Sequence, residues 1–200
     1  MSLTLDLYLA STSPRRRDLL LAAGLRFALC EPGPEYEPGA IGEHDSEAGD
    51  PAAHAVARAR RKGLGARPPL PTVPVLAVDT VVDLDGKELG KPRDRNGAER
   101  MLRSLFGRCH RVHTAHSLSL PTIGWHAERL ASATVYCEAP PDAQLRRYLD
   151  SDQWLGKAGS YGLQDPAQSF LVLQDGAFDT VVGLHVAAVR ELLAAAGRRQ

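Results

Sequence analysis

The sequence has no excess of charge of either sign, because 24 lysines and arginines balance 24 aspartates and glutamates. A neutral protein lacks the broad positive field that attracts a nucleic acid polymer or an anionic membrane, so we expect neither as a partner. Any site that binds an anion must therefore be local.

Cysteines and long apolar runs are also scarce. The three cysteines, Cys30, Cys109 and Cys137, are far apart and form no C-x-x-C pair, which is typical of free thiols in a reducing compartment. No apolar run approaches the length of a membrane span, and Asp6 interrupts the first apolar stretch, so we identify no signal peptide. These features predict a cytoplasmic protein.

Several catalytic signatures are missing as well. The sequence contains no G-x-x-x-x-G-K-[ST], no G-x-G-x-x-G and no G-x-S-x-G. Three histidines fall close together, but on a strand His110 and His116 share one face while His113 takes the other. This spread argues against a histidine metal site.

What is present is an interleaved pattern of strands and helices. The 200 residues are enough for one domain, 1–200, which can be divided into two lobes. We expect strands at 3–10, 25–30, 111–120 and 129–139, a hairpin at 75–94 around Asp85-Gly86, and helices at 14–23, 51–66, 94–107, 140–151 and 186–197. Residues 169–184 are expected to form two strands, or a strand and a loop, and the acidic segment 31–50, rich in glycine and proline, is expected to be a mobile loop. The pattern predicts a mixed α/β sheet.

The stretch STSPRRRDLL, residues 11–20, has the features of a helix start, since Ser13 or Thr12 can cap the first turn and Pro14 suits the first helical position. Arginines 15–17 then lie at the positive end of the helix dipole, at a cost of ~0.3–1 kcal/mol per charge. Free N–H groups and arginine side chains there suit a phosphate. The alternative is a solvated charged face, and three adjacent arginines cannot all share one side of a helix.

Asp79 interrupts the apolar run VLAVDTVV, residues 75–82. A carboxylate is disfavoured in the middle of a strand and is costly to bury without a partner. It needs a metal ion, a cation or a water molecule to act on, unless it is a structural aspartate or marks a strand end. Thr80 is expected on the opposite face if the strand continues.

Two further segments are candidates for ligand contacts. Lys91 precedes a proline, which holds it in extended backbone, although alone it is better explained as a solvent-facing lysine. The segment GKAGSYGLQ, residues 156–164, carries Lys157 and Gln164 among glycines that allow a ligand close to the backbone.

The segments LASTSPRR, AVDTVV, GKPRD, HTA, GKAGSYGLQ and VVGL occur in that order. Together they resemble the Maf family of nucleoside triphosphate pyrophosphatases, over nearly the whole sequence. The resemblance implies an elongated, twisted mixed sheet flanked by helices, similar to the inosine triphosphatase fold, with two lobes and a central cleft. It also implies hydrolysis of a nucleoside triphosphate to the monophosphate and pyrophosphate, with a divalent metal, Mg²⁺ or Mn²⁺.

The resemblance assigns roles to individual residues. Asp79 matches the family's proton acceptor, and whether it is the general base or a metal ligand stays open. Glu35 matches an acidic residue that would hold the metal with Asp79. The phosphate-binding positions are matched by Ser11, Ser13, Arg15, Arg16, Lys62 and Lys91. The positions that mark the thymine/uracil-selective branch are matched by Arg16, Thr80 and Gln164.

The resemblance therefore implies a house-cleaning pyrophosphatase for dTTP and UTP, with modified pyrimidine nucleotides as further candidates, and a homodimer. The sequence departs from the family pattern at Arg61, Asp165 and His185, so base preference is less firmly fixed than reaction class. One alternative is a pyrophosphatase for another modified nucleotide, such as 7-methyl-GTP. The other is a nucleotide-binding regulator of cell division without turnover.

Overall fold

The structure is a computed structural model that describes residues 5–34 and 49–199. Its strands are β1 (Leu7–Leu9), β2 (Phe27–Leu29), β3 (Val75–Leu84), β4 (Lys87–Leu89), β5 (Arg108–Leu120), β6 (Trp125–Cys137) and β7 (Leu171–Asp175). Its helices are α1 (Pro14–Ala22), α2 (Pro51–Leu64), α3 (Arg95–Leu105), α4 (Asp142–Asp150), α5 (Phe178–Val182) and α6 (Val186–Gly197). None of the helices in the described ranges is long and apolar enough to cross a membrane.

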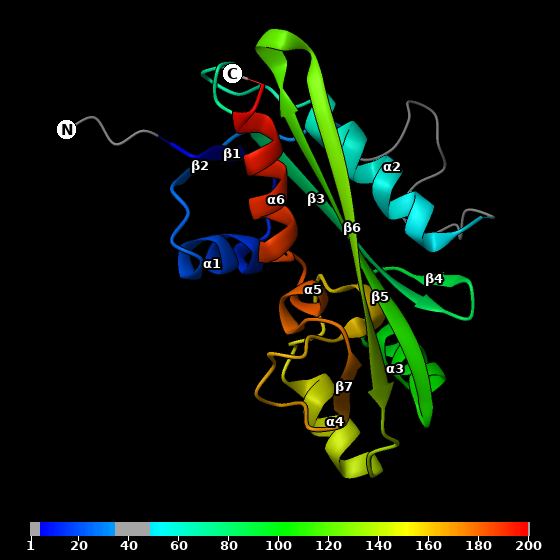
Figure 1. The fold of residues 1–200 in the computed structure, drawn as a ribbon. Coiled ribbons are helices and arrows are strands. Elements are labelled where there is room, and N and C mark those ends of the chain that lie inside the picture. The colour runs from blue at the N-terminus through cyan, green and yellow to red at the C-terminus, as the bar shows by residue number, and fades with distance from the viewer. Residues whose placement is uncertain (1–4, 35–48, 200) are drawn as a thin grey trace.

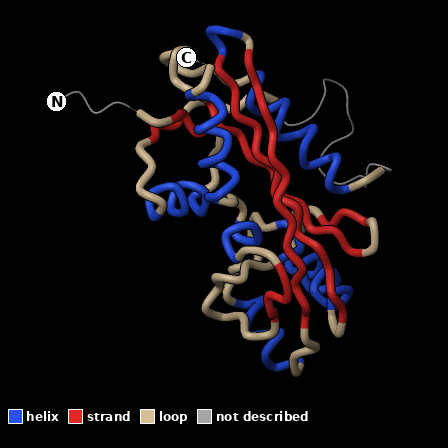
Figure 2. The backbone as a smooth tube through the Cα atoms, in the orientation of Figure 1, coloured by secondary structure: helices blue, strands red, loops and turns tan. Residues whose placement is uncertain are grey.

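The strands form one mixed sheet, which confirms the predicted fold class. Its order is β2-β1-β3-β5-β6-β7, with β4 paired to β3. β1 runs parallel to β2 and β3, and the other neighbouring strands are antiparallel. The long β5–β6 hairpin extends from one end of the molecule to the other, which gives the fold its elongated shape (Figures 1 and 2).

β3 directs alternate side chains into two layers. Val81 packs with Ala59 of α2, whereas Val78 packs in the opposite layer with α1 and α6. Figure 1 shows α2 on one side of the sheet and α6 on the other. Because successive strand residues alternate between faces, Asp79 points toward α2 and Thr80 points toward α1.

The molecule has a separate core toward each end. One core lies where α1 and α6 cover β1 and the first half of β3, around Leu76 and Val189. The other lies where α3, α4 and β7 surround the far end of the β5–β6 hairpin, around Leu102 and Tyr148. β3, β5 and β6 connect the two cores, and Asp79 lies on β3 between them.

One edge of β3 changes its partner along the strand. β1 pairs with this edge as far as Leu76, and β4 pairs with it from Val82 onward. Between these two residues no strand of the described chain covers this edge, while β5 pairs with the other edge from Val75 to Asp83. The uncovered edge lets side chains from both faces of β3 reach one space.

Most predicted elements are confirmed, including the hairpin turn at Asp85-Gly86, although β5 and β6 begin earlier than predicted, at Arg108 and Trp125. The prediction for residues 169–184 was wrong, because β7 is followed there by the helix α5. β-branched residues favour a strand in that sequence, but α5 packs against β5 and β6. Its Thr180 carbonyl also accepts a hydrogen bond from the Thr114 hydroxyl at 2.7 Å.

Most of the predicted loop 31–50, including Glu35, lies outside the described residues. At its described start, Glu31 forms an isolated antiparallel bridge with Arg67.

Candidate active site

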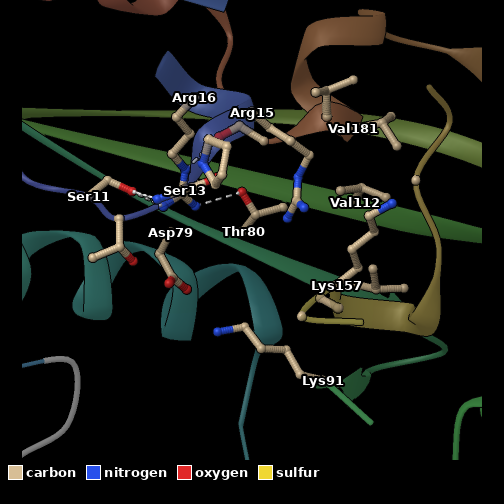
Figure 3. Close-up of a pocket in the computed structure, with 18 of the residues that line it drawn as sticks. Ser11, Ser13, Arg15, Arg16, Asp79, Thr80, Lys91, Val112, Lys157 and Val181 are labelled. Carbon is tan, nitrogen blue, oxygen red and sulfur yellow. Dashed lines mark hydrogen bonds between the residues drawn. The ribbon is translucent and has the colours of Figure 1, made fainter. Parts of the chain in front are cut away.

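A cavity of about 710 Å³ opens at the uncovered edge of β3. It is bounded by the start of α1, by α2, by the β3–β4 hairpin, by the glycine-rich loop after α4 and by the end of α5. Ligand pockets for small molecules have volumes of roughly 300–1,000 Å³, so this cavity has the size of a nucleotide site. Figure 3 shows part of its lining.

Arg16 joins α1 to the opposite wall of the cavity. Its Nη1 donates to the Ser11 hydroxyl at 3.1 Å, and its Nη2 donates to the Thr80 hydroxyl at 3.3 Å (Figure 3). Its Nε donates to the Gly183 carbonyl at 2.9 Å. These three acceptors are neutral oxygens, and together they fix the orientation of the guanidinium.

The predicted helix cap takes a different form. Ser13 occupies the N-cap of α1, but its hydroxyl makes no cap hydrogen bond. Instead its N–H donates to the Ser11 hydroxyl at 3.2 Å. Ser11 therefore accepts from both the backbone of Ser13 and the guanidinium of Arg16, and it holds the start of α1 against the cavity.

The three arginines of α1 do not all face the cavity, because successive residues of a helix point in different directions. Arg15 and Arg16 line the cavity, and Arg17 is not part of the lining. Burial lowers the pKa of Arg15, and the carboxylate of Asp165 opposes that shift. Two guanidinium groups thus face the cavity from one helix end.

Asp79 is 5% exposed and sits between two cations of α2. Its Oδ1 lies 2.7 Å from Lys62 Nζ, and its Oδ2 lies 3.5 Å from Arg58 Nε. Arg58 Nη2 in turn lies 2.5 Å from Glu88 Oε2 on β4. All four side chains line the cavity.

The glycine-rich loop supplies a second lysine–carboxylate pair. Lys157 Nζ forms an ion pair with Asp165, and the Tyr148 hydroxyl donates to the other carboxylate oxygen of Asp165 at 2.8 Å. Burial lowers the pKa of Lys157, and the ion pair with Asp165 opposes that shift. Lys157 lines the cavity whereas Asp165 is not part of the lining, so the loop presents the cation and keeps the anion behind it.

Gln164 and Tyr161 lie on the cavity side of the same loop. A Cβ at Gly162 would lie 2.5 Å from Gln164 Nε2, so only glycine leaves room for this position of the glutamine side chain. Tyr161 is supported from beneath by His110, whose Nε2 forms a hydrogen bond with the tyrosine hydroxyl. The loop is therefore fixed by contacts outside the cavity.

The family model described as a Maf-like protein matches residues 6–196. The chain belongs to the Maf family. A dTTP/UTP pyrophosphatase of Bordetella parapertussis is 42% identical, over 96% of this chain and 92% of its own length. A dTTP/UTP pyrophosphatase of Thermus thermophilus is also 42% identical, over 96% of each chain.

Among solved structures, a HAM1 protein from Coxiella burnetii matches 98% of this chain and 100% of its own at 15% identity, with a TM-score of 0.46.

The cavity brings together nearly all of the residues for which the Maf resemblance implies a role. Those found in the lining are Ser11, Ser13, Arg15, Arg16, Lys62, Asp79, Thr80, Lys91 and Gln164. Figure 3 shows Arg15, Lys91 and Lys157 entering the lining from three different segments. Glu35 lies outside the described residues, so the structure gives it no position.

Sequence reasoning missed Arg58 and Glu88. The signal that could have found Arg58 is its spacing, since it stands four residues before Lys62 on α2 and so shares its face. Glu88 gave no comparable signal, because charged residues are common in a short strand next to a hairpin turn.

Each of the three histidines of β5 forms a hydrogen bond within the protein. His110 supports Tyr161, and His113 lies 2.7 Å from the Ser132 hydroxyl. His116 Nε2 accepts from the His185 N–H at 2.9 Å. Within the described ranges no group of three or more possible ligands among His, Cys, Asp and Glu could hold a metal.

Proposed function

We propose that this Maf-family chain is a pyrophosphatase that hydrolyses dTTP and UTP to the nucleoside monophosphate and pyrophosphate. The observation that supports this most is the arrangement of one carboxylate, Asp79, among the cations of a nucleotide-sized cavity. The names of its relatives point to the same substrates. Removal of unwanted nucleotides from the pool is the corresponding biological role.

The cations would bind the triphosphate. Phosphoryl transfer depends mainly on positioning and on stabilising negative charge, because it leaves little covalent chemistry for the protein to do. Arg15 and Arg16 approach from the N-terminus of α1, where free N–H groups add to the positive field. Lys62 and Lys91 would hold the phosphates from the other side, including the pyrophosphate that leaves.

Asp79 would accept the proton. The oxygen of a water molecule bonds to the α-phosphorus, while the bond from that phosphorus to the bridging oxygen of the β-phosphate breaks. Pyrophosphate leaves with the electron pair of that bond, and one proton of the water must be taken up. Asp79 lies at the uncovered edge of β3, within the cavity and beside Lys62, which makes it the best-placed acceptor among the carboxylates described.

The proposed cofactor is a divalent cation, Mg²⁺ or Mn²⁺. Such ions take oxygen ligands and commonly bind one or two carboxylates together with phosphate oxygens of the substrate. The carboxylate of Asp79 fits this donor set, and Glu35 is the second proposed ligand. When bound, the ion would neutralise part of the phosphate charge.

Gln164 would recognise the base, and Arg16 and Thr80 would contribute to the selectivity of the site. The amide of Gln164 can donate to one carbonyl of thymine or uracil and accept from the ring N3–H. Its place on the cavity side of the loop supports this role.

The deciding experiment is pyrophosphate release from a panel of nucleoside triphosphates with Mg²⁺ or Mn²⁺, for wild type and Asp79→Asn. Asp85→Asn is the matched control, because Asp85 is exposed at the turn of the same hairpin. Release from dTTP and UTP that is lost only in Asp79→Asn supports the proposal. Release from a different nucleotide, such as 7-methyl-GTP, would replace the substrate assignment, and no release at all would favour the regulator.

Two further predictions concern the cell. We propose that the protein is a homodimer and that it is cytoplasmic. Light scattering on the purified protein tests the first proposal, and fractionation of its host cells tests the second.

A further inference from the structure

α2 carries a row of basic side chains along the face that meets the β3–β4 hairpin. His54, Arg58 and Lys62 are spaced four residues apart, so they lie on one stripe of the helix. Two carboxylates of the hairpin, Asp79 and Glu88, fit between them. We call these five residues the charge row.

The charge row alternates in sign from Glu88 through Arg58 and Asp79 to Lys62, and the imidazole of His54 adjoins Glu88. His54 Nδ1 lies 3.4 Å from Glu88 Oε2, and Arg58 Nη2 lies 2.5 Å from the same oxygen. Arg58 Nε then lies 3.5 Å from Asp79 Oδ2, and Lys62 Nζ lies 2.7 Å from Asp79 Oδ1. The row therefore contains the carboxylate that the proposed reaction uses, held between Arg58 and Lys62.

The two cations that hold Asp79 are not equivalent. Lys62 has a flexible stem and a compact charge, so it can turn from Asp79 to a phosphate when a nucleotide enters. Arg58 is planar, is 6% exposed, and is anchored to Glu88, so its guanidinium has little freedom to follow. Of the two cations, we therefore expect only Arg58 to keep its ion pair with Asp79 while the nucleotide is bound and hydrolysed.

We propose that Arg58 is a positioning residue, which Glu88 fixes in place and which holds the Asp79 carboxylate in its reactive orientation while Lys62 is engaged by the substrate. This inference rests on the proposed function. It assigns to Arg58 no contact with the reacting atoms, and it assigns to Glu88 the task of orienting Arg58.

An ion pair kept only for stability would behave differently. Burying two charges costs solvation, and replacing a buried pair by apolar side chains of similar size is often neutral or stabilising. A purely structural Arg58–Glu88 pair should therefore be replaceable without loss of turnover. A pair that orients Asp79 should not be.

The test is the double variant Arg58→Met/Glu88→Met, which removes the pair without leaving a lone buried charge. We expect it to melt at or above the wild-type temperature and to keep its KM for dTTP, while kcat falls by roughly 10- to 100-fold because the carboxylate is misaligned. Arg58→Lys should restore part of kcat, and Glu88→Gln should lower kcat less than Arg58→Met does.

The matched control is Arg60→Met/Glu128→Met. Arg60 lies on the same helix and pairs with Glu128 at 2.5 Å, but this pair is outside the cavity lining. Its removal should leave kcat unchanged.

The outcomes separate the two proposals. A wild type that turns over dTTP, together with an Arg58→Met/Glu88→Met variant of unchanged kcat, would overturn the role of Arg58 alone. A rise in KM with kcat unchanged would also overturn it, because Arg58 would then be a binding group. A wild type that releases no pyrophosphate from any nucleotide would overturn the proposed function, and the role of Arg58 with it.

Discussion

Two lysine–carboxylate pairs flank the cavity, and they face it in opposite ways. Lys62 and Asp79 both line the cavity, on the wall made by α2 and the β3–β4 hairpin. On the wall made by the glycine-rich loop, Lys157 lines the cavity but Asp165 stands behind it, against Tyr148. The same chemical pair therefore presents an anion to the ligand on one wall only.

The difference shows that ion pairing alone does not mark a reactive carboxylate. Asp165 is 6% exposed and Asp79 is 5% exposed, so burial does not separate them either. What separates them is the uncovered edge of β3, which opens Asp79 to the cavity. Asp79 is placed to act on a ligand, and Asp165 is placed to hold Lys157 and the loop.

The largest expected effect comes from comparing Asp79→Asn with Asp165→Asn. Each variant removes the carboxylate of a buried ion pair, so we expect both to lose stability, by roughly 3–5 kcal/mol in the free energy of unfolding. Only Asp79→Asn should lose turnover, by roughly 100- to 10,000-fold in kcat, the contribution of a general base. Steady-state pyrophosphate release and urea denaturation measure the two quantities.

The same pair of variants can also contradict the comparison. Equal losses of kcat in Asp79→Asn and Asp165→Asn, measured well below both melting temperatures, would mean that the two walls do not differ in function.

The next largest effect is expected at α1. Arg16→Met should lower kcat/KM by roughly 100- to 1,000-fold, because it removes an oriented donor from a site that stabilises phosphate charge. Arg17→Met is the matched control, since Arg17 follows Arg16 on the same helix but is not part of the cavity lining. A comparable loss in both variants would show that α1 acts through general charge and not through an oriented guanidinium.

The sequence identified Asp79 for a physical reason, because a lone charge within an apolar strand needs a partner. It also predicted that Arg15, Arg16 and Arg17 could not all face one way. The alternation of β3 predicted opposite faces for Asp79 and Thr80, and the structure confirms that arrangement. Such inferences succeed because they depend on the local geometry of a single element.

The parts that the sequence could not predict depend on contacts between elements. Glu88 belongs to the candidate site only because β4 places it beside Arg58. The helix α5 forms because it packs on β5 and β6, although its sequence locally favours a strand. The separation of Asp165 from the cavity is likewise invisible until the loop is folded over Tyr148. Lys62 was found by family resemblance and not by its spacing.

A smaller effect is expected for base selection on the loop wall. Gln164→Ala should raise KM for dTTP and UTP by roughly 5- to 10-fold, the equivalent of about 1 kcal/mol for lost hydrogen bonds to the base. KM for a nucleotide whose base lacks that pattern, such as ATP, should change little. Gln174→Ala is the control, because Gln174 is exposed on β7 and lies outside the cavity lining. Equal losses on all nucleotides would remove Gln164 from base recognition.

The last effect concerns the stability of the loop wall and not turnover, and it depends on pH. Burial lowers the pKa of His110, beneath Tyr161, to about 4 from an ordinary value of 6.5. The unfolded state therefore binds the proton more readily, so this stability is present above pH 6.5 and is lost as the pH falls from 6.5 toward 4. The loss between pH 7 and pH 5 should be about 2 kcal/mol for this residue.

His110→Gln keeps a polar partner for the Tyr161 hydroxyl but removes the titrating ring. Urea denaturation at the two pH values should therefore show a loss about 2 kcal/mol smaller in this variant than in wild type. His126→Gln, at an exposed position on β6, is the matched loss of an imidazole. A wild type and a His110→Gln variant that lose the same stability on acidification would show that His110 is not buried in its neutral form, and the loop wall would then need another support.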